Sequence, residues 1–334
     1  LIASQYLDGQ SGGGASGDSQ YTWSPWGSFL NASYLYGDRD ATELEDAFDF
    51  DGYDINGGFD YRLSNNNVIG LMMGYQTQEI DFDSSQSVVD GGVEMNGYSV
   101  QPFYLYQSDS WYFSSSIGYQ MMQFETERRI SYPSLNPNVE SVNTVSVSEN
   151  DASSLSGSMT LGFAWSPLAA LGLEPYISVN YRDISIDGFT ERDVNSDGFD
   201  FVVGKQEIDS LESAFGLKLH YVLAPSFGVF VPYIDVQHRN QYEDKPTEIK
   251  AYYVDASEAL TDIDAASFIL PSDDPDTSYQ IYTVGLSMVI QGSYESDDSG
   301  VAAGGMSAYI KYRTFVGIDH YSQSQIAGGL RYEF

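Results

Sequence analysis

The chain has 334 residues and is strongly acidic, with 48 Asp and Glu against 14 Lys and Arg and a formal net charge of −34. This charge excludes a nucleic-acid-binding protein, because binding a run of phosphates requires clustered cations. The chain has no cysteine, which excludes disulfides, thiolate metal sites and thiol nucleophiles. Its 27 Tyr, 18 Phe and 32 Gly favour an all-β protein, and no stretch approaches the ~20 consecutive apolar residues of a membrane helix.

Residues 1–24 are predicted to be a linker segment. Residues 1–7 have the pattern of the tail of an amphipathic helix, a short helical stub, and residues 8–20 are rich in Gly and Ser, which is typical of a flexible connection. No export signal is visible in this segment. If the rest of the chain is exported, we expect a signal peptide to have been removed or to lie outside this chain.

From residue 25 onward, apolar residues recur at every second position, which is the period of a β-strand. Apolar and Gly residues occupy the odd positions of 53–63 and 155–165 and the even positions of 326–334, and the other face of each run is mostly small, polar or charged. A soluble β-sandwich is the alternative explanation, but its strands usually have five or six residues. Runs of ten or more with a polar second face indicate strands that cross a bilayer around a water-filled lumen.

Twelve such segments are predicted, and we assign residues 25–334 to one antiparallel transmembrane β-barrel. The segments are 26–37, 51–63, 68–82, 94–106, 111–129, 152–165, 173–186, 208–223, 227–239, 278–290, 304–316 and 321–334. Short turns alternate with long loops, and the long loops are predicted at 38–50, 83–93, 130–151, 187–207 and 240–277. An even strand number with this alternation is typical of an outer-membrane barrel whose termini and short turns are periplasmic.

The tryptophans and the acids agree with this orientation. All four tryptophans, Trp23, Trp26, Trp111 and Trp165, fall at the short-turn end, as an interfacial aromatic girdle requires. Most of the acids fall in and beside the long loops. We therefore expect a strongly negative extracellular face, which attracts divalent cations from the lipopolysaccharide layer.

Several segments, in their order along the chain, resemble the C-terminal translocator domain of classical monomeric autotransporters. The segments are 52–82, 104–130 with Trp111-Tyr112 and Arg128-Arg129, Pro175-Tyr176 with 187–191, 231–233 with His238, and 312–334. The resemblance covers residues 25–334. It implies a barrel in the outer membrane of a Gram-negative bacterium that carries an N-terminal passenger across, with a helix threaded through the pore.

The function that the resemblance implies is the passage or surface anchoring of an N-terminal passenger. Only about 25 residues precede the first predicted strand, so the passenger is expected upstream of this chain, or has been removed, or is lacking. Two alternatives remain open. One is a stand-alone outer-membrane channel or porin for small solutes, and the other is a structural barrel that partners another envelope protein.

By the same alternation, charged residues of the strands point into the lumen. The predicted pore-lining residues are Arg62, Glu174, Arg182, Glu212, Lys218, His220, Lys311 and Arg313, with Arg331 and Glu333 in addition. Charges of both signs can pair and brace a hydrated pore without binding a specific solute. Many other inward positions are Gly or Ser, so we expect residues 1–20 to enter the lumen and partly occlude it. The alternative is that these residues hang in the periplasm.

The last strand carries a predicted assembly signal, formed by Gly329, Tyr332 and Phe334. An exposed edge strand with a terminal aromatic residue is a β-augmentation ligand, and the family resemblance implies that the barrel-assembly machinery reads it. The same aromatic residues also suit an interfacial girdle. The other expected partners are outer-membrane lipid, lipopolysaccharide and the chain's own passenger, with no nucleic acid.

One long loop has the spacing of a calcium-binding loop. The predicted ligands are the side chains of Asp193, Asn195 and Asp197 and the backbone carbonyl of Phe199. The twelfth position is Gly204 rather than Glu, so the bidentate ligand is missing unless Asp200 or Glu207 replaces it. An acidic turn without an ion is the alternative, and no cofactor is otherwise required.

No catalytic arrangement is predicted. Gly17-Asp18-Ser19 is similar to the nucleophile block of lipases whose passengers ride on such barrels, but it lies in the linker with no core before it and no His nearby. A phosphate-binding loop, a paired-carboxylate cleft and a nucleophile–base pair are also lacking from the pattern. We therefore predict that the barrel is not an enzyme.

Overall fold

The computed structural model describes residues 25–83, 85, 89–108, 110–225, 228–242, 248–254, 267–290 and 305–333. The predicted linker of residues 1–24, which includes Trp23, lies outside the described residues, and so does Phe334 of the predicted assembly signal. Within these described ranges, no helix is long and apolar enough to cross a membrane.

Twelve antiparallel strands close into a barrel, as predicted. The wall strands are β1 (Trp26–Arg39), β2 (Phe48–Ser64), β3 (Asn67–Phe82), β4 (Val89–Gln107), β5 (Trp111–Tyr132), β6 (Val142–Phe163), β8 (Leu171–Ile186), β12 (Gln206–Tyr221), β13 (Val229–Gln241), β16 (Ser278–Ile290), β17 (Met306–Val316) and β18 (Tyr321–Glu333). Strand β1 pairs with β2 on one side and with β18 on the other, so the sheet closes on itself. Each predicted segment corresponds to one wall strand.

Parts of the predicted long loops are β-structure. Strands β9 (Phe189–Thr190), β11 (Phe201–Val203), β14 (Glu248–Tyr253) and β15 (Phe268–Pro271) form a four-stranded sheet in the order β15-β14-β11-β9. Strand β10 (Arg192–Asp193) pairs with β6, which begins at Val142 rather than at the predicted residue 152. The physical reason is the content of these segments in β-branched and aromatic residues, which fit a pleated, half-buried surface.

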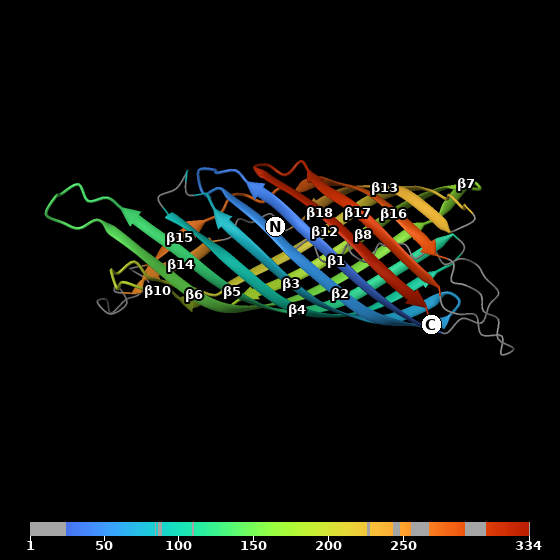
Figure 1. Ribbon diagram of the computed structural model, residues 1–334, viewed down its shortest axis with the longest axis horizontal. Helices are drawn as coiled ribbons and strands as arrows, with labels where there is room; N and C mark the ends of the chain where they lie inside the picture. The colour runs from blue at the N-terminus through green and yellow to red at the C-terminus, as the bar shows by residue number, and fades with distance from the viewer. Residues whose placement is uncertain are drawn as a thin grey trace.

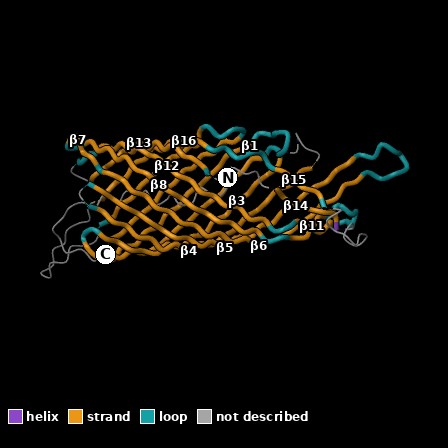
Figure 2. The backbone as a smooth tube through the Cα atoms, turned by 180° about the vertical axis from the view of Figure 1, so that it is seen from behind, coloured by secondary structure: helices purple, strands orange, loops and turns teal. Residues whose placement is uncertain are grey.

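The two ends of the barrel differ. Figure 1 shows the β5–β6 hairpin projecting from one end, where β14 and β15 also lie, and the short strand β7 (Trp165–Leu168) at the opposite end. The view from behind in Figure 2 shows β11 beside β14 and β15 at the same end as the projecting hairpin. We call this end the long-loop rim and the other end the short-turn rim.

The outer face carries an apolar band bordered by aromatic side chains. Trp26, Trp111 and Trp165 are 51–55% exposed at the short-turn rim, as predicted for the tryptophans that the structure describes. The opposite border is a row of exposed tyrosines, which we call the tyrosine girdle: Tyr36, Tyr53, Tyr75, Tyr98, Tyr119, Tyr181, Tyr282 and Tyr312. Two aromatic borders around an apolar band are the outer surface of a transmembrane barrel.

On the inner face, aromatic rings pack over glycines of neighbouring strands. A Cβ atom at Gly216 would lie 2.2 Å from the ring of Tyr176, and one at Gly285 would lie 2.4 Å from the ring of Tyr233. Among the described residues, six such pairs lie one at every second strand interface: Phe29–Gly58, Phe103–Gly70, Tyr112–Gly162, Tyr176–Gly216, Tyr233–Gly285 and Tyr309–Gly329. A seventh pair, Phe50–Gly37, lies nearer the long-loop rim on β2 and β1. The glycines let the rings lie flat against the wall, which keeps the lumen from being filled by them.

Candidate functional site: the lumen

The structure places the predicted pore-lining charges on the inner face of the barrel. Lys311 and Arg313 are 5% and 2% exposed, whereas their neighbours Ile310 and Tyr312 are 58% and 39% exposed on the outside. The same alternation puts the remaining predicted residues on the inner faces of β2, β8 and β12: Arg62, Glu174, Arg182, Glu212, Lys218 and His220.

One wall of the lumen, formed by β12, β13 and β16, carries a buried hydrogen-bond network. Arg239 Nη1 lies 3.1 Å from Glu212 Oε2, and the Tyr279 hydroxyl donates to Glu212 Oε1 at 2.7 Å. Gln237 extends the network, because it accepts a hydrogen bond from Arg239 Nε at 3.2 Å and donates one to Asp235 Oδ2 at 3.2 Å. All five side chains are buried, so the charges on this wall are held in place by their partners.

The middle of the wall formed by β4, β5 and β6 is different, because it is lined by uncharged polar side chains and glycines. Gln101 Nε2 donates to Ser116 Oγ at 2.7 Å, and Ser116 Oγ lies 2.7 Å from Ser158 Oγ. At Gly118, an added Cβ atom would lie 2.5 Å from Ser156 Oγ. The lumen thus has one charged wall and one wall of small polar residues.

Two further groups of charges lie toward the short-turn rim. Glu174 lies 3.7 Å from Lys218 Nζ and 3.2 Å from His220 Nδ1. Asp60 accepts two hydrogen bonds from Arg331, at 2.6 and 2.7 Å. Each group places both signs of charge together, which braces the wall without assembling a site for one solute.

Three of these lumen residues, Asp60, Asp235 and Arg239, are absent from the predicted set. The signal that identifies them is present in the sequence. Asp60 occupies the polar phase of the 53–63 alternation, and Asp235 and Arg239 occupy the phase opposite to the exposed Ile234 and Val236. A systematic use of the two-residue period predicts all three.

At the long-loop rim, two arginines join segments that are far apart in the sequence. Arg39 forms ion pairs of 2.9 Å with Glu45 and 2.7 Å with Asp273. Arg128 on β5 forms two hydrogen bonds with Glu191, at 3.1 and 2.5 Å. These contacts anchor the long loops to the wall.

The predicted calcium ligands are arranged as a hydrogen-bonded turn. The Asp193 carboxylate accepts hydrogen bonds from the backbone N–H groups of Asn195 at 3.0 Å and Asp197 at 2.9 Å. The Phe199 carbonyl accepts a hydrogen bond from Arg128 Nη2 at 2.6 Å. In the part of the chain that the structure describes, no three His, Asp or Glu side chains gather as metal ligands. Two of the four predicted ligands thus have protein partners, the Asp193 carboxylate within the turn and the Phe199 carbonyl with Arg128. Calcium binding at this loop stays a prediction.

The described part of the predicted assembly signal lies on β18. Tyr332 is 43% exposed on the outer face, level with the short-turn rim, and Gly329 lies on the inner face beside Tyr309 and Asn31. Gly329 thus has a packing role in the wall, whereas Tyr332 belongs to the outer aromatic border. The recognition of this strand by assembly machinery stays a prediction.

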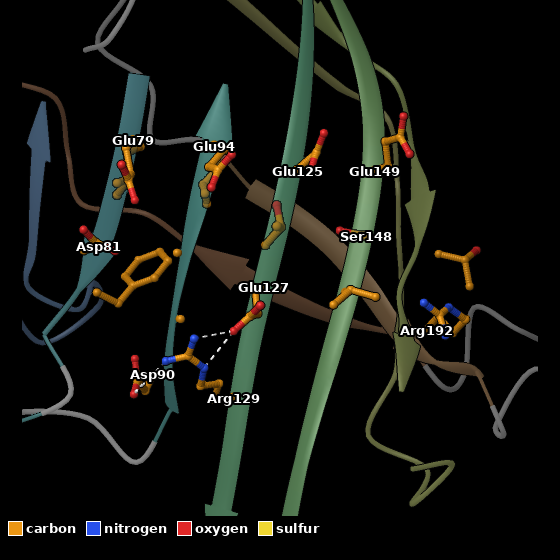
Figure 3. Close-up of a pocket in the computed structure, with 18 residues that line it drawn as sticks. Glu79, Asp81, Asp90, Glu94, Glu125, Glu127, Arg129, Ser148, Glu149 and Arg192 are labelled. Atoms are coloured by element: carbon orange, nitrogen blue, oxygen red, sulfur yellow. Dashed lines mark hydrogen bonds and ion pairs between the residues drawn. The ribbon is translucent and has the colours of Figure 1, made fainter. Parts of the chain in front are cut away.

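The outer face of β3–β6 at the long-loop rim forms a groove of about 640 Å³. Glu79, Glu94, Glu125 and Glu149 are cross-strand partners on four adjacent strands, and Figure 3 shows them in a row along the groove. Arg129 lies beside the row, and its Nη2 atom lies 2.6 Å from Oε1 of Glu127 on the same strand β5. Carboxylates directly opposite one another repel, so this row makes the outer face of β3–β6 strongly negative at the long-loop rim.

Comparison with known proteins gives a consistent result. The family model for the autotransporter β-domain matches residues 28–295. An uncharacterized protein of the trpE-trpG intergenic region of Pseudomonas putida is 23% identical over 227 residues, which cover 68% of this chain and 35% of that protein. Lipase 1 of Photorhabdus luminescens is 26% identical over 235 residues, which cover 70% of this chain and 32% of that protein. The chain thus spans about a third of the length of the curated relatives that it matches.

Among the solved structures with a similar fold are translocator domains of autotransporters. The translocator domain of the autotransporter NalP from Neisseria meningitidis has a TM-score of 0.64 at 11% identity, covering 94% of this chain and 90% of that one. The β-domain of the Bordetella autotransporter BrkA has a TM-score of 0.55 at 13% identity, covering 93% of this chain and all of that one. At these identities the similarity concerns the fold.

Proposed function

Because the chain belongs to the autotransporter β-domain family, we propose that it is the outer-membrane barrel that carries an N-terminal passenger across that membrane or anchors it at the surface. The observation that carries this proposal is the position of β1. Trp26 pairs with Tyr61 at the short-turn rim, so the chain that precedes β1 joins the barrel there, next to the polar lumen. With short turns in the periplasm and long loops outside, a preceding segment has a direct route through the barrel.

The experiment is secretion of a reporter. A folded epitope-tagged domain fused before residue 1, behind an export signal, is expected to become accessible to protease added to intact cells. A reporter that stays protected in cells with a correctly folded barrel would contradict the proposal. Tryptic accessibility of a known periplasmic protein in the same cells controls for leaking envelopes.

Orientation has its own test, since the chain contains no cysteine. Leu135, at the tip of the β5–β6 hairpin, is fully exposed, and Asn66 lies in the turn between β2 and β3. We expect Leu135→Cys to react with a bulky membrane-impermeant maleimide on intact cells and Asn66→Cys to react only after the outer membrane is opened. The reverse pattern would invert the proposed orientation.

We also propose that residues 1–20 enter the lumen. The wall of small polar residues on β4, β5 and β6 supports this, because it leaves space beside it. Cysteines at Ser4 and Ser156 are expected to form a disulfide in the folded barrel. Free reaction of the Ser4→Cys thiol with a bulky periplasmic reagent, without cross-links at any of several lumen positions, would contradict it.

The barrel itself is proposed to have no catalytic activity. The words esterase and lipase in the names of relatives describe proteins of which this chain spans about a third. The proposed partners are the barrel-assembly machinery, lipopolysaccharide with its divalent cations, and a passenger. A stand-alone channel for small solutes is the second candidate function, favoured by the partly exposed charges of Glu174, Lys218 and His220 near the short-turn rim. A structural barrel for another envelope protein is the third.

A further inference from the structure

The turns of the short-turn rim differ sharply in polarity. The turn between β2 and β3 reads Ser-Asn-Asn-Asn over residues 64–67, and the turn between β4 and β5 reads Gln-Ser-Asp-Ser over residues 107–110. Around the β7–β8 turn and the β12–β13 turn, by contrast, neither residues 163–173 nor residues 219–231 contain an Asp, Glu, Lys or Arg. Leu168 and Leu223 in these turns are 65% and 47% exposed. One sector of the rim thus presents apolar side chains where another presents polar ones.

The two apolar turns lie side by side and form one surface, which we call the apolar turn pair. Strand β8 pairs with β12 as far as Leu171 and Tyr221, and beyond these strands the Val222 N–H donates to the Ala170 carbonyl at 2.7 Å. Leu223 and Phe230 exchange two backbone hydrogen bonds, at 2.8 and 2.7 Å. Figures 1 and 2 place β7 at the end of the barrel opposite to the β5–β6 hairpin. The pairing satisfies these backbone groups, so apolar side chains dominate the surface that is left.

The exposed side chain of the β7–β8 turn points to the outside of the barrel. Trp165 pairs with Leu173, and Leu168 pairs with Leu171, with a register irregularity between the two pairs. Residues three positions apart would face opposite sides of a regular strand, and one extra residue brings them back to the same side. Leu168 therefore shares the outer face with Trp165, which belongs to the aromatic border.

Leu223 continues the outer face of β12 in the same way. It has the phase of Leu219 and Tyr221, which are 40% and 48% exposed on the outside. Its bridge partner Phe230 has the phase of Ile234, which is 51% exposed on the outside of β13. The apolar turn pair is thus continuous with the apolar band that faces the membrane.

The apolar turn pair also extends past the aromatic border. Leu171, the partner of Leu168, lies two residues beyond Leu173, which pairs with Trp165, and Leu223 lies two residues beyond Tyr221. In a tilted strand that rises ~3.3 Å per residue, two residues correspond to about 5 Å along the barrel axis. Apolar side chains of segments that lie in a membrane interface are buried to about that depth, ~5–10 Å.

We propose that the apolar turn pair is a lipid-binding surface that inserts into the leaflet on the short-turn side, which is the periplasmic leaflet in the proposed orientation. The bilayer then covers this sector of the barrel further down than it covers the sector of the polar turns. Lipid fits this surface better than a folded protein does, because a protein interface carries a polar and charged rim. The two turns supply no charged residue for such a rim. The proposal needs a membrane-spanning barrel but does not depend on secretion.

The test is a fluorescence quenching measurement on the full-length chain, folded into vesicles of phosphatidylethanolamine and phosphatidylglycerol. Because the chain has no cysteine, an environment-sensitive fluorophore can be attached at Leu168→Cys or Leu223→Cys, with Asn66→Cys in the polar β2–β3 turn as the matched control. We expect the labels at 168 and 223 to be quenched by lipids with brominated acyl chains. Quenching by iodide in the water is expected to be several-fold weaker at these two positions than at 66.

Each outcome decides the proposal. Lipid quenching at 168 and 223, with iodide quenching confined to 66, supports it. Equal iodide quenching at the three positions would overturn it, since the apolar turns would then lie in water. Protection that disappears when the protein is diluted with excess lipid would overturn it as well, because a second copy of the chain would then cover the surface. The two labelled positions belong to different turns, so one variant carries the test if the other fails to fold.

Discussion

Asp60 on β2 and Arg331 on β18 form two hydrogen bonds across the intervening strand β1, at 2.6 and 2.7 Å. The pair passes over Gly27 of β1, where an added Cβ atom would lie 2.8 Å from Arg331 Nη2 and 2.9 Å from Asp60 Oδ1. Asp60 is 3% exposed. One side-chain pair thus ties the second and last strands of the barrel to each other across the first, at the seam where the sheet closes.

We predict that Asp60→Asn destabilises the barrel by on the order of 3 kcal/mol, because it leaves the Arg331 guanidinium without its buried counter-charge. Unfolding in guanidinium chloride, followed by tryptophan fluorescence in detergent micelles, measures the change. The double variant Asp60→Asn with Arg331→Gln is expected to lose less than the sum of the two single variants. Strict additivity would show that the pair does not act as a unit.

The wall of the barrel is predictable from the sequence because each wall strand alternates between lipid and lumen. The run from Tyr53 to Leu63 predicts both the strand and the inward position of Asp60. The same rule does not predict the extension of β6 back to Val142, since that segment is held by pairing along its length with the end of β5, up to Tyr132, and at two residues with β10. The alternation within one strand carries no information about how far its partners extend.

The arrangement of the rim also depends on contacts that the sequence does not reveal. Asp193 fits a calcium-loop spacing, and nothing near it in the sequence shows that Thr144 and Arg128 would reach the same turn.

The turn at Asp193 predicts a pH dependence. Burial would raise the pKa of Asp193, but hydrogen bonds from the Thr144 hydroxyl and from the backbone N–H groups of Asn195, Phe199 and Asp197 outweigh it and lower the pKa below its usual value. A carboxyl group with a lowered folded-state pKa stabilises the fold above its unfolded-state pKa of about 3.9, and this contribution is lost as the pH falls through the folded-state value. The turn should therefore be firm at neutral pH and loosen in acid.

Hydrogen exchange of the peptide that spans residues 193–200 tests this dependence. At neutral pH the native chain is expected to protect these amides more than the Asp193→Asn variant does. As the pH falls through the lowered pKa of Asp193, the two chains should come to exchange alike, because the native carboxyl group then becomes neutral, as the Asn side chain already is. A difference between them that persists unchanged in acid would contradict the assignment of the stabilisation to the carboxylate.

Arg128 is predicted to hold the loop sheet on the wall. Its guanidinium binds Glu191 through two hydrogen bonds and lies 4.2 Å from the ring centroid of Phe201. Arg128→Gln should cost roughly 1.5–3 kcal/mol of local stability, in the range for hydrogen bonds to charged groups. The measurement is the rate of proteolysis within residues 187–203 of the folded barrel, which should rise in the variant.

The neighbouring arginine supplies the control for this prediction. Arg129 lies on the outer face, with its side chain 59% exposed, and pairs with Glu127. Exposed ion pairs of this kind contribute about 0–1 kcal/mol, so Arg129→Gln should leave proteolysis of the loop sheet almost unchanged. Equal effects of the two substitutions would mean that total charge, rather than the contacts of Arg128, sets the stability of the loops.

The packing of rings over glycines gives the last prediction. A Cβ atom at Gly216 would lie 2.2 Å from the ring of Tyr176, and the ring cannot turn away freely because its hydroxyl donates to Asp235 at 2.9 Å. Gly216→Ala should therefore cost roughly 1–3 kcal/mol, the usual effect of overpacking. Gly57 is the matched control, because an added Cβ atom there meets its nearest atoms at 3.5 Å, and Gly57→Ala should change stability by less than about 0.5 kcal/mol.

Adding Tyr176→Ala to Gly216→Ala removes the clash, so the double variant should be more stable than the sum of the single effects predicts. Equal stabilities of the Gly216→Ala and Gly57→Ala variants in guanidinium unfolding would show that the ring is free to move and that the glycine is not required for packing.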